Sequence, residues 1–394
     1  MTQFSDKIKT LKPSTIREIL KVTADPTVIS FAAGNPAPEC FPTQQMEEIS
    51  KKIFSRMPGA AFQYGISEGY APLRESVKAR MKRYGIGKDF DDCMIVSGGQ
   101  QGIELSAKVL LNEGDCVICE QPSFIGALNA FRSFNINLVG APLEQDGVDI
   151  NALENIIKSN KNVKLLYLIP TFQNPTGRTM SLEKRKAVLE LADKYDLIIL
   201  EDDPYFELRY SGEFVPSIKS MDKNGRVIYC GSFSKIIAPG IRVGYVCCRE
   251  DIFSKIVVAK QVSDVHTNMF YMIMVNEYLT NYDIDGDIAK TCVIYKEKRD
   301  AMAAAIDKFA DGKLSYNLPE GGLFLWCELP EGYNGFELCK LAGAKKVAAV
   351  PGSSFGVDES QVSPALRLNF SLPSIELINK GIELLSGVVK DFVK

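Results

Sequence analysis

The most informative stretch of this chain is SFSKIIAPGIR, residues 232–242. It lies at the junction of two apolar runs, Val227–Cys230 and Ile241–Cys248, that are expected to form strands. The stretch brings a lysine amine, Lys235, and a guanidinium, Arg242, onto one short loop with two serine hydroxyls. A guanidinium binds phosphate through paired hydrogen bonds, and a lysine amine condenses with an aldehyde. The loop therefore suits a ligand with both groups, although a surface turn would explain it equally well when taken alone.

The middle of the chain alternates strand-like and helix-like patterns, which predicts an α/β fold with a mostly parallel sheet. Ser181 is the expected N-cap of a helix that runs through Tyr195. That helix lies between two apolar runs, so residues 164–200 form a βαβ unit. The predicted strands in this region are Cys93–Val96, Cys116–Cys119, Lys164–Ile169, Leu197–Leu200 and Val227–Cys230.

Polar or glycine-rich segments follow the carboxyl ends of these strands. The carboxyl ends of parallel strands meet at one edge of a sheet, which is where ligands bind in such folds. A helix is also expected to begin just after Gly98-Gly99, and its first N–H groups could hold a phosphate. We therefore expect a single site built from Gly98, Gly99, Phe124, Asn174, Asp202 and Lys235.

Several of these side chains suit the parts of pyridoxal phosphate. Asp202 can pair with a protonated pyridine nitrogen, which keeps the ring an electron sink, and Asn174 and Tyr205 can donate to the ring oxygen. Arg367, flanked by apolar residues, has the bidentate geometry that suits an amino-acid carboxylate. Taken singly, the first three are also explained by turn chemistry and Arg367 by a buried ion pair.

Composition excludes several other functions. The chain has 394 residues and a net charge of −3, which gives no electrostatic reason to expect nucleic acid or an anionic membrane as partner. The single histidine, His266, argues against zinc sites built on several histidines and against a Ser-His-Asp hydrolase, and no metal ion is expected. No signal peptide or membrane-spanning run is evident.

Ten cysteines are scattered along the chain, which indicates reduced thiols and a cytoplasmic location. Cys116 and Cys119 have the spacing of a redox or metal pair, but they lie in a predicted strand without a second such motif. We therefore expect them to be two buried thiols.

Taken together and in this order, the motifs resemble those of the class I/II aminotransferases, which are fold-type I pyridoxal-phosphate enzymes. The resemblance runs from about Ser14 to the C-terminus and is closest to the subgroup of 2-aminoadipate and kynurenine aminotransferases and the aminotransferase-like domain of MocR-type regulators. The motifs that carry it are ISFAAGNPAPECFP, QYGISEGYAPLR, SGGQQG, NPTG, EDDPY, SFSKIIAPGIRVGY, GGLFLW, VPGSSF and LRLNFS.

The resemblance implies a large cofactor-binding domain at residues 46–280, with a mostly parallel seven-stranded sheet flanked by helices. A smaller α+β domain would combine residues 1–45 and 281–394. It also implies a homodimer with composite active sites, in which Tyr64 reaches the phosphate bound by the neighbouring subunit.

The same resemblance implies a role for each site residue. Lys235 would bond the cofactor and move the proton at the substrate α-carbon, with Asp202 and Tyr205 as the other catalytic residues. Cofactor-binding residues would be Gly99, Gln100, Phe124, Asn174, Asp202, Tyr205, Ser232, Ser234, Lys235 and Arg242. Substrate-binding residues would be Arg367, Asn174, Gly34 and Arg17.

The implied reaction is transfer of an α-amino group from an amino acid to a 2-oxo acid, with 2-oxoglutarate as the favoured acceptor and ping-pong kinetics. A lyase that performs β-elimination on the same scaffold is the alternative enzyme. A ligand-sensing module of a MocR-type regulator is less favoured, because the motifs begin by about residue 14 and leave no room for a DNA-binding domain. The amino donor stays open between acidic, aromatic and aliphatic side chains.

Overall fold

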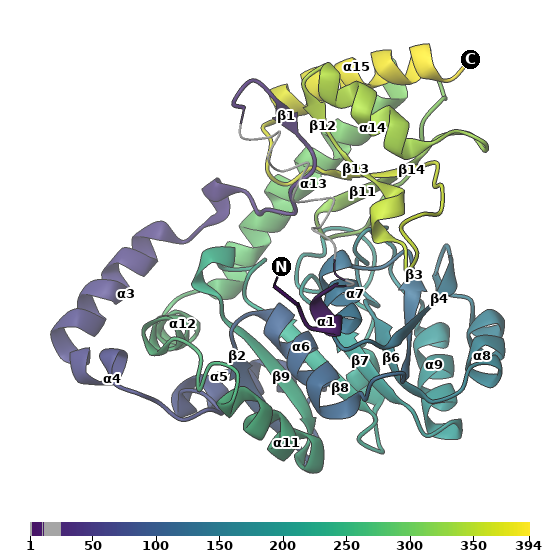
Figure 1. The fold of residues 1–394 in the computed structure, drawn as a ribbon. Helices are drawn as coiled ribbons and strands as arrows, with labels where there is room; N and C mark the ends of the chain where they lie inside the picture. The colour runs from purple at the N-terminus through teal and green to yellow at the C-terminus, as the bar shows by residue number, and fades with distance from the viewer. Residues whose placement is uncertain (1, 10, 12–24) are drawn as a thin grey trace.

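The computed structural model describes residues 2–9, 11 and 25–394 of the chain. A central eight-stranded sheet has the order β2-β9-β8-β7-β6-β3-β4-β5 (Figure 1). Its strands are β2 (Asp91–Val96), β3 (Cys116–Gln121), β4 (Asn137–Glu144), β5 (Gly147–Val148), β6 (Val163–Leu168), β7 (Ile198–Asp202), β8 (Val227–Ser232) and β9 (Gly244–Arg249).

The predicted α/β fold with a mostly parallel sheet is confirmed, but the sheet has eight strands where seven were expected. Strands β8, β7, β6, β3 and β4 are parallel, and the extra strand, β5, is antiparallel to β4. Two residues separate the paired Glu144 and Gly147, so β5 is the short return arm of a tight hairpin. A two-residue strand has no apolar alternation, and no pattern in the sequence could reveal it.

Helices cover both faces of this sheet. One face packs against α6 (Gly99–Leu110), α7 (Ile125–Arg132) and α11 (Glu250–Gln261), and the other against α8 (Ile150–Ser159) and α9 (Leu182–Lys194). Side chains alternate along β3, so Cys119 belongs to the first apolar cluster and Cys116 to the second. Both thiols are buried and unpaired, as predicted.

Of two predicted element boundaries, the structure confirms one and shifts the other. Ser181 is the N-cap of α9 and accepts a hydrogen bond from the Lys184 backbone N–H, as predicted. The strand expected from Ile241 begins only at Gly244, because Pro239–Ile241 forms a 3-10 turn and Arg242 takes a left-handed conformation with φ of 52°.

A second layer of structure comes from both ends of the chain, and Figure 1 shows it above the central sheet. Its four-stranded antiparallel sheet has the order β10-β11-β14-β13, while β1 (Ile29–Ser30) pairs in parallel with β12 (Val347–Ala348). The pairing of β1 with β12 brings the two chain ends together. The other elements of this layer are β10 (Ser315–Asn317), β11 (Phe324–Glu328), β13 (Val350–Pro351), η3 (Gly352–Phe355), β14 (Ala365–Asn369), α13 (Ile284–Phe309), α14 (Gly335–Ala344) and α15 (Ile375–Phe392).

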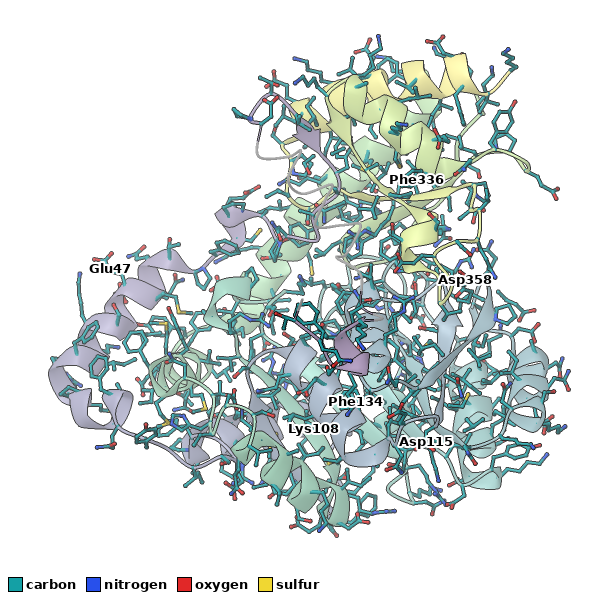
Figure 2. All side chains as sticks on the ribbon, in the orientation of Figure 1. Glu47, Lys108, Asp115, Phe134, Phe336 and Asp358 are labelled. Atoms are coloured by element: carbon teal, nitrogen blue, oxygen red, sulfur yellow. The ribbon has the colours of Figure 1, made fainter. Side chains whose placement is uncertain are left out.

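The division into domains at residues 45 and 46 stays a prediction, and that point falls within α3 (Thr43–Arg56). Helix α3 packs against α12 (Met269–Asn281), and Glu47 points from it into solvent (Figure 2). No helix in the described ranges is long and apolar enough to cross a membrane. The remaining elements are α1 (Asp6–Lys9), η1 (Pro38–Cys40), α4 (Pro58–Phe62), α5 (Ala71–Lys82), α10 (Ile218–Met221) and η2 (Pro239–Ile241).

Strand direction decides where the site forms. Strand β9 is antiparallel to both of its neighbours, β8 and β2, so β2 runs in the same direction as β8 and the other parallel strands. The carboxyl ends of β2, β3, β6, β7 and β8 therefore meet at one edge of the sheet, together with the loop that enters β9. The expected placement of the polar residues on one sheet edge is confirmed.

A buried glutamate holds the loop between β6 and α9 at this edge. Glu120 Oε2 accepts hydrogen bonds from the Ile169 N–H at 2.9 Å and from Gln173 Nε2 at 3.4 Å. Gln173 Oε1 in turn accepts from the backbone and hydroxyl of Thr176, which encloses Asn174 in a tied loop. Burial raises the pKa of Glu120 to about 8, and the hydrogen bonds oppose this rise only in part.

Replacing Glu120 by Gln should flatten the pH dependence of stability. Because the folded protein holds this proton up to about pH 8 and the unfolded chain releases it near 4.5, the carboxyl lowers the free energy of unfolding as pH rises from 5 to 8. At pH 8.5 the free energy of unfolding of the E120Q variant should exceed that of the wild type by up to about 3 kcal/mol. Urea unfolding of the apoprotein across pH 5–9 measures this gain.

Glu154→Gln is the matched control. Hydrogen bonds from Lys194, Tyr195 and Lys158 lower the pKa of Glu154 to about 2. The contribution of this carboxylate to the free energy of unfolding is therefore constant at every pH above its ordinary pKa. The difference in stability between E154Q and the wild type should therefore be constant from pH 5.5 to 8. A constant difference for E120Q over the same range would contradict the assignment.

Candidate active site

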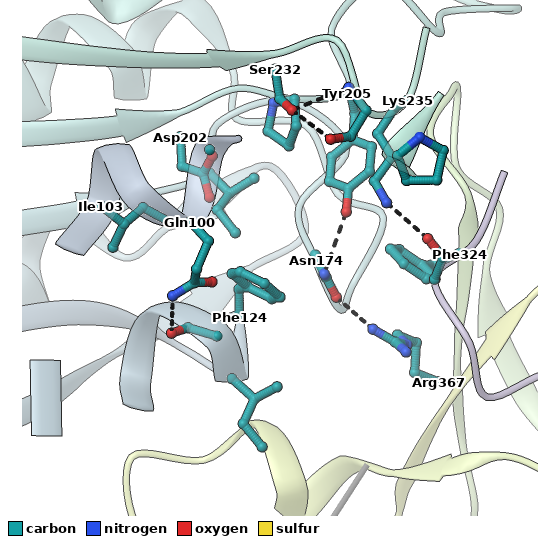
Figure 3. Close-up of a pocket in the computed structure, with 18 of the residues that line it drawn as sticks. Gln100, Ile103, Phe124, Asn174, Asp202, Tyr205, Ser232, Lys235, Phe324 and Arg367 are labelled. Atoms are coloured by element: carbon teal, nitrogen blue, oxygen red, sulfur yellow. Dashed lines mark hydrogen bonds between the residues drawn. The ribbon is translucent and has the colours of Figure 1, made fainter. Parts of the chain in front are cut away.

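A cavity of about 380 Å³ opens at the carboxyl edge of the central sheet (Figure 3). Its lining combines residues from the strand ends with residues of the upper layer, including Phe324 and Arg367. Of the fourteen residues to which the resemblance assigns a role, twelve line it: Gly34, Gly99, Gln100, Phe124, Asn174, Asp202, Tyr205, Ser232, Ser234, Lys235, Arg242 and Arg367.

Lys235 follows β8 and its side chain enters this cavity. Its Nζ donates a hydrogen bond to the Gly34 carbonyl at 2.9 Å (Figure 3). Burial, together with the charges of Arg367 and Arg242, lowers the pKa of Lys235 to about 8, and the charge of Asp202 opposes this shift. The loop is thus no surface turn, and its amine is far easier to deprotonate than that of an ordinary lysine.

A second group of donors surrounds the start of α6. The Ser232 hydroxyl donates to the Ser234 hydroxyl at 3.0 Å, and Arg242 Nη2 donates to the Ser97 carbonyl at 3.3 Å. Gly98 has a φ of 82°, and a Cβ there would lie 2.3 Å from Arg242 Nη2, so glycine is required for the guanidinium to lie this close. The first N–H groups of α6, at Gly99 and beyond, have no acceptor within the helix.

Asp202 ends β7 and presents its carboxylate to the cavity. The Tyr167 hydroxyl donates to Oδ2 at 2.7 Å and so orients the group. Burial raises the pKa of Asp202 to about 6, even though the bond from Tyr167 and the charge of Lys235 oppose this rise. The carboxylate is therefore ionised at neutral pH and can pair with a cation.

A chain of hydrogen bonds connects three of the predicted residues (Figure 3). Arg367 Nη1 donates to Asn174 Oδ1 at 2.9 Å, and Asn174 Nδ2 lies 3.4 Å from the Tyr205 hydroxyl. Arg367 Nη2 donates to the Ala32 carbonyl at 2.7 Å. Asn174 and Tyr205 thus converge on one region of the cavity, as expected from the sequence.

Arg367 is buried without a carboxylate partner. Among the described residues no ion pair involves it, and its Nε has no hydrogen-bond acceptor. The rings of Phe324 and Phe355 lie 4.2 and 4.9 Å from its guanidinium carbon, and burial lowers its pKa to about 10. The alternative of a structural ion pair is therefore wrong within the described chain, and a buried guanidinium of this kind suits an anionic ligand.

Phe124 and Gln100 lie close together on a different wall of the cavity. Phe124 is the residue before α7, and Gln100 Nε2 donates to the Gly126 carbonyl at 2.8 Å. A Cβ on Gly126 would lie 2.4 Å from the Phe124 ring, so any larger residue at position 126 would clash with the ring. The exposed face of the ring can pack on a flat ligand.

One predicted residue with a described position, Tyr64, does not line the cavity. Tyr64 is 80% exposed and its ring lies edge-on to His266 at 5.8 Å, outside this site. Arg17 lies outside the described residues.

Sequence reasoning missed four residues that support the site: Tyr167, Phe324, Phe355 and Glu120. Phe324 and Phe355 stand in GGLFLW and VPGSSF, two motifs that were quoted without a role for any residue. Tyr167 lies in a predicted strand and Glu120 directly follows one, and neither carries a local signal, because the function of each depends on a neighbouring segment.

The arrangement suits a ligand with two separated anionic groups. Ser232 and Arg367 lie at opposite ends of the view in Figure 3, with Tyr205 and Asn174 between them. Ser232 belongs to the group of donors at the start of α6, whereas Arg367 lies at the opposite end of the cavity, where it donates a hydrogen bond to Asn174. The residues present therefore fit pyridoxal phosphate and an amino-acid carboxylate, with a reactive amine on Lys235.

Comparison with known proteins identifies the family. Residues 26–385 match the family model described as aminotransferase class I and II. The chain is 42% identical over 396 aligned residues to aromatic-amino-acid aminotransferase 1 of Thermococcus litoralis, covering 99% of this chain and 95% of that relative.

Solved structures agree with this result. Pyrococcus horikoshii kynurenine aminotransferase, in complex with PMP, matches with a TM-score of 0.95 and 40% identity over 99% of this chain and 98% of that one. The α-aminoadipate aminotransferase of Thermus thermophilus, complexed with N-(5'-phosphopyridoxyl)-L-leucine, matches with a TM-score of 0.91 and 35% identity over 99% and 98%. The chain therefore belongs to the aminotransferase class I and II family and is an aminotransferase that uses pyridoxal phosphate.

Proposed function

We propose that this enzyme transfers the α-amino group of an amino acid to a 2-oxo acid, with Lys235 as the residue that bonds the cofactor and moves the proton. The acceptor is 2-oxoglutarate, and the two half-reactions follow ping-pong kinetics. The observation that carries the proposal is Lys235 itself, an amine with a pKa of about 8 in one cavity with Asp202 and Arg367.

Each part of the cofactor has a residue to hold it. Bound pyridoxal phosphate supplies an aldehyde that condenses with amines and a ring that accepts electrons from the α-carbon. Asp202 pairs with the ring nitrogen, Asn174 and Tyr205 donate to the ring oxygen, and Phe124 packs on the ring face. The phosphate is held by Gly99, Gln100, Ser232, Ser234 and Arg242.

Lys235 then serves as the base and acid at the substrate α-carbon. At pH 7 an amine with a pKa near 8 is neutral in about one-tenth of molecules, which is enough to accept a proton and return it. The neighbouring charges of Arg367 and Arg242 favour this neutral form. Tyr205 and Asp202 complete the catalytic set.

Arg367 binds the substrate α-carboxylate, together with Asn174 and the backbone at Gly34. The described lining next to Arg367 includes the apolar ring of Phe324. This lining favours an amino donor with an aromatic or aliphatic side chain, in keeping with the aromatic-amino-acid relative. A donor with an acidic side chain would depend on Arg17, which lies outside the described residues.

The working unit is a homodimer with composite sites, in which Tyr64 of each subunit reaches the phosphate bound by the other. Tyr64 belongs to a group of exposed apolar side chains that also includes Phe54, Phe62 and Ile66. Of these, Phe54 and Phe62 stack with ring centroids 5.9 Å apart, and exposed apolar side chains that gather in this way commonly mark a subunit interface. All ten cysteines are free, which suits the reducing cytoplasm that the sequence indicates.

The proposed role of Lys235 is tested by Lys235→Ala. The variant should lose the visible absorbance of the covalently held cofactor, and turnover should fall by about 10⁴-fold or more, because bonding and proton transfer both depend on this amine. Absorbance spectra, borohydride trapping and an amino-transfer assay with 2-oxoglutarate measure these effects.

Lys255→Ala, at an exposed position of α11, is the control and should behave like the wild type. A K235A protein with the wild-type spectrum and turnover would show that the assignment is wrong. Release of ammonia without an oxo-acid acceptor, in the wild type, would favour a lyase.

Arg367→Gln tests the carboxylate site. Because the amide has no charge and fewer donors, kcat/KM for the amino donor should fall by about a hundredfold or more, mainly through KM. Cofactor absorbance should be retained. Steady-state kinetics of R367Q and of R178Q, an arginine that does not line this cavity, make the comparison. Equal losses in the two variants would contradict the role of Arg367.

A further inference from the structure

A buried lysine lies beneath the start of α6, outside the cavity described above. Lys260, in α11, has a side chain with no exposed surface, and its Nζ donates to Gln101 Oε1 at 2.7 Å and to Asp264 Oδ1 at 2.8 Å. Burial lowers the pKa of Lys260, and the pairing with Asp264 opposes this. Burying a charged amine in this way costs free energy, and its contacts indicate a role other than packing.

The partners of Lys260 converge on Ser97, the residue between β2 and the glycine pair. The other oxygen of Asp264 accepts from the Ser97 hydroxyl and from Gln101 Nε2, both at 2.8 Å. Gln101 Oε1 also accepts from the Ser97 backbone N–H at 2.7 Å. Ser97 is therefore held through its backbone and its side chain by a closed set of charge-assisted bonds.

Ser97 connects this set to the proposed phosphate donors. Its carbonyl accepts from Arg242 Nη2 at 3.3 Å, and the next residues along the chain are Gly98 and Gly99, where α6 begins. A displacement of Ser97 would shift both the arginine and the first N–H groups of the helix. Donors that bind an anion bidentately lose strength quickly when they are misaligned.

We propose that Lys260, Asp264, Gln101 and Ser97 form a positioning network that fixes the phosphate-binding donors at the start of α6. The inference rests on the proposed function, in which those donors hold the cofactor phosphate. Lys260 is a positioning residue in this scheme and does not touch the cofactor. Its effect should therefore appear in phosphate recognition and should be absent from ligands without a phosphate.

The test compares binding of pyridoxal phosphate and of phosphate-free pyridoxal to apoenzyme of the wild type and of Lys260→Met. Affinity for pyridoxal phosphate should fall by about tenfold or more, the effect that loss of an outer hydrogen-bonding residue has at metal sites. Affinity for pyridoxal should change little. The ratio of the two affinities isolates the phosphate contribution from any general loss of stability.

Asp264→Asn separates positioning from simple charge. The Lys260 substitution removes a positive charge near the phosphate site, and the Asp264 substitution removes a negative one. If charge alone mattered, D264N would tighten phosphate binding while K260M weakened it. The positioning network predicts that both variants weaken it, and tighter binding by D264N would overturn the proposal.

Lys219→Met is the matched control. Lys219 is equally buried and paired, with Asp91 at 2.7 Å and Asp222 at 3.2 Å, but Asp91 begins β2 at the opposite edge of the sheet. K219M should lower the unfolding midpoint without changing the ratio of the two affinities. An equal change of that ratio in K219M and K260M would show a general structural effect and contradict the proposal.

Ser97→Ala keeps the proposal testable if K260M does not fold. Loss of one hydroxyl at this half-exposed position should leave the fold intact and lower the affinity for pyridoxal phosphate in the same direction. Unchanged phosphate selectivity in S97A and D264N would overturn the proposal. If the wild type itself binds pyridoxal phosphate no more tightly than pyridoxal, the phosphate-binding role assigned under the proposed function is wrong.

Discussion

The shared direction of six strands is the constraint on which the rest of the structure depends. Because β9 is antiparallel to both neighbours, β2 regains the direction of the parallel strands, and six carboxyl ends meet at one edge. Loops from the upper layer then close this edge, as the bond from Lys235 to the Gly34 carbonyl shows. Reversal of β9 also places Arg242, which precedes it, beside the start of α6.

The electrostatics of the cavity follow from the charged side chains that this edge of the sheet brings together. Lys235, Arg242 and Arg367 line the site, while Asp202 is the carboxylate among its described lining residues. Burial and mutual repulsion lower the pKa of Lys235, for which we propose a task that requires a neutral amine, whereas Arg367 stays charged because its ordinary pKa is so high. In the proposed function, a bound phosphate and a bound carboxylate offset this excess of positive charge, so the charges of the free site favour anionic ligands.

Much of the fold and site could be predicted, because strand ends, turn residues and apolar runs are local signals. Asn174 and Asp202 were found because each follows a recognisable strand. Strand β5 was missed because two residues show no alternation, and Tyr167 because its hydroxyl acts on a carboxylate in the adjacent strand. The network around Lys260 had no signal either, since its members come from segments separated by about 160 residues.

The sequence by itself determined the strand–helix alternation, the N-cap of α9 and the identities of the groups that can carry the chemistry. These depend on neighbours within a few residues, where backbone geometry and side-chain periodicity act. Only the tertiary structure decided that Arg367 lacks a carboxylate partner in the described chain, that Lys235 has a lowered pKa and that Ser97 is held by Lys260 and Asp264. Burial and the distance between charges set these properties, and both arise only when distant segments pack together.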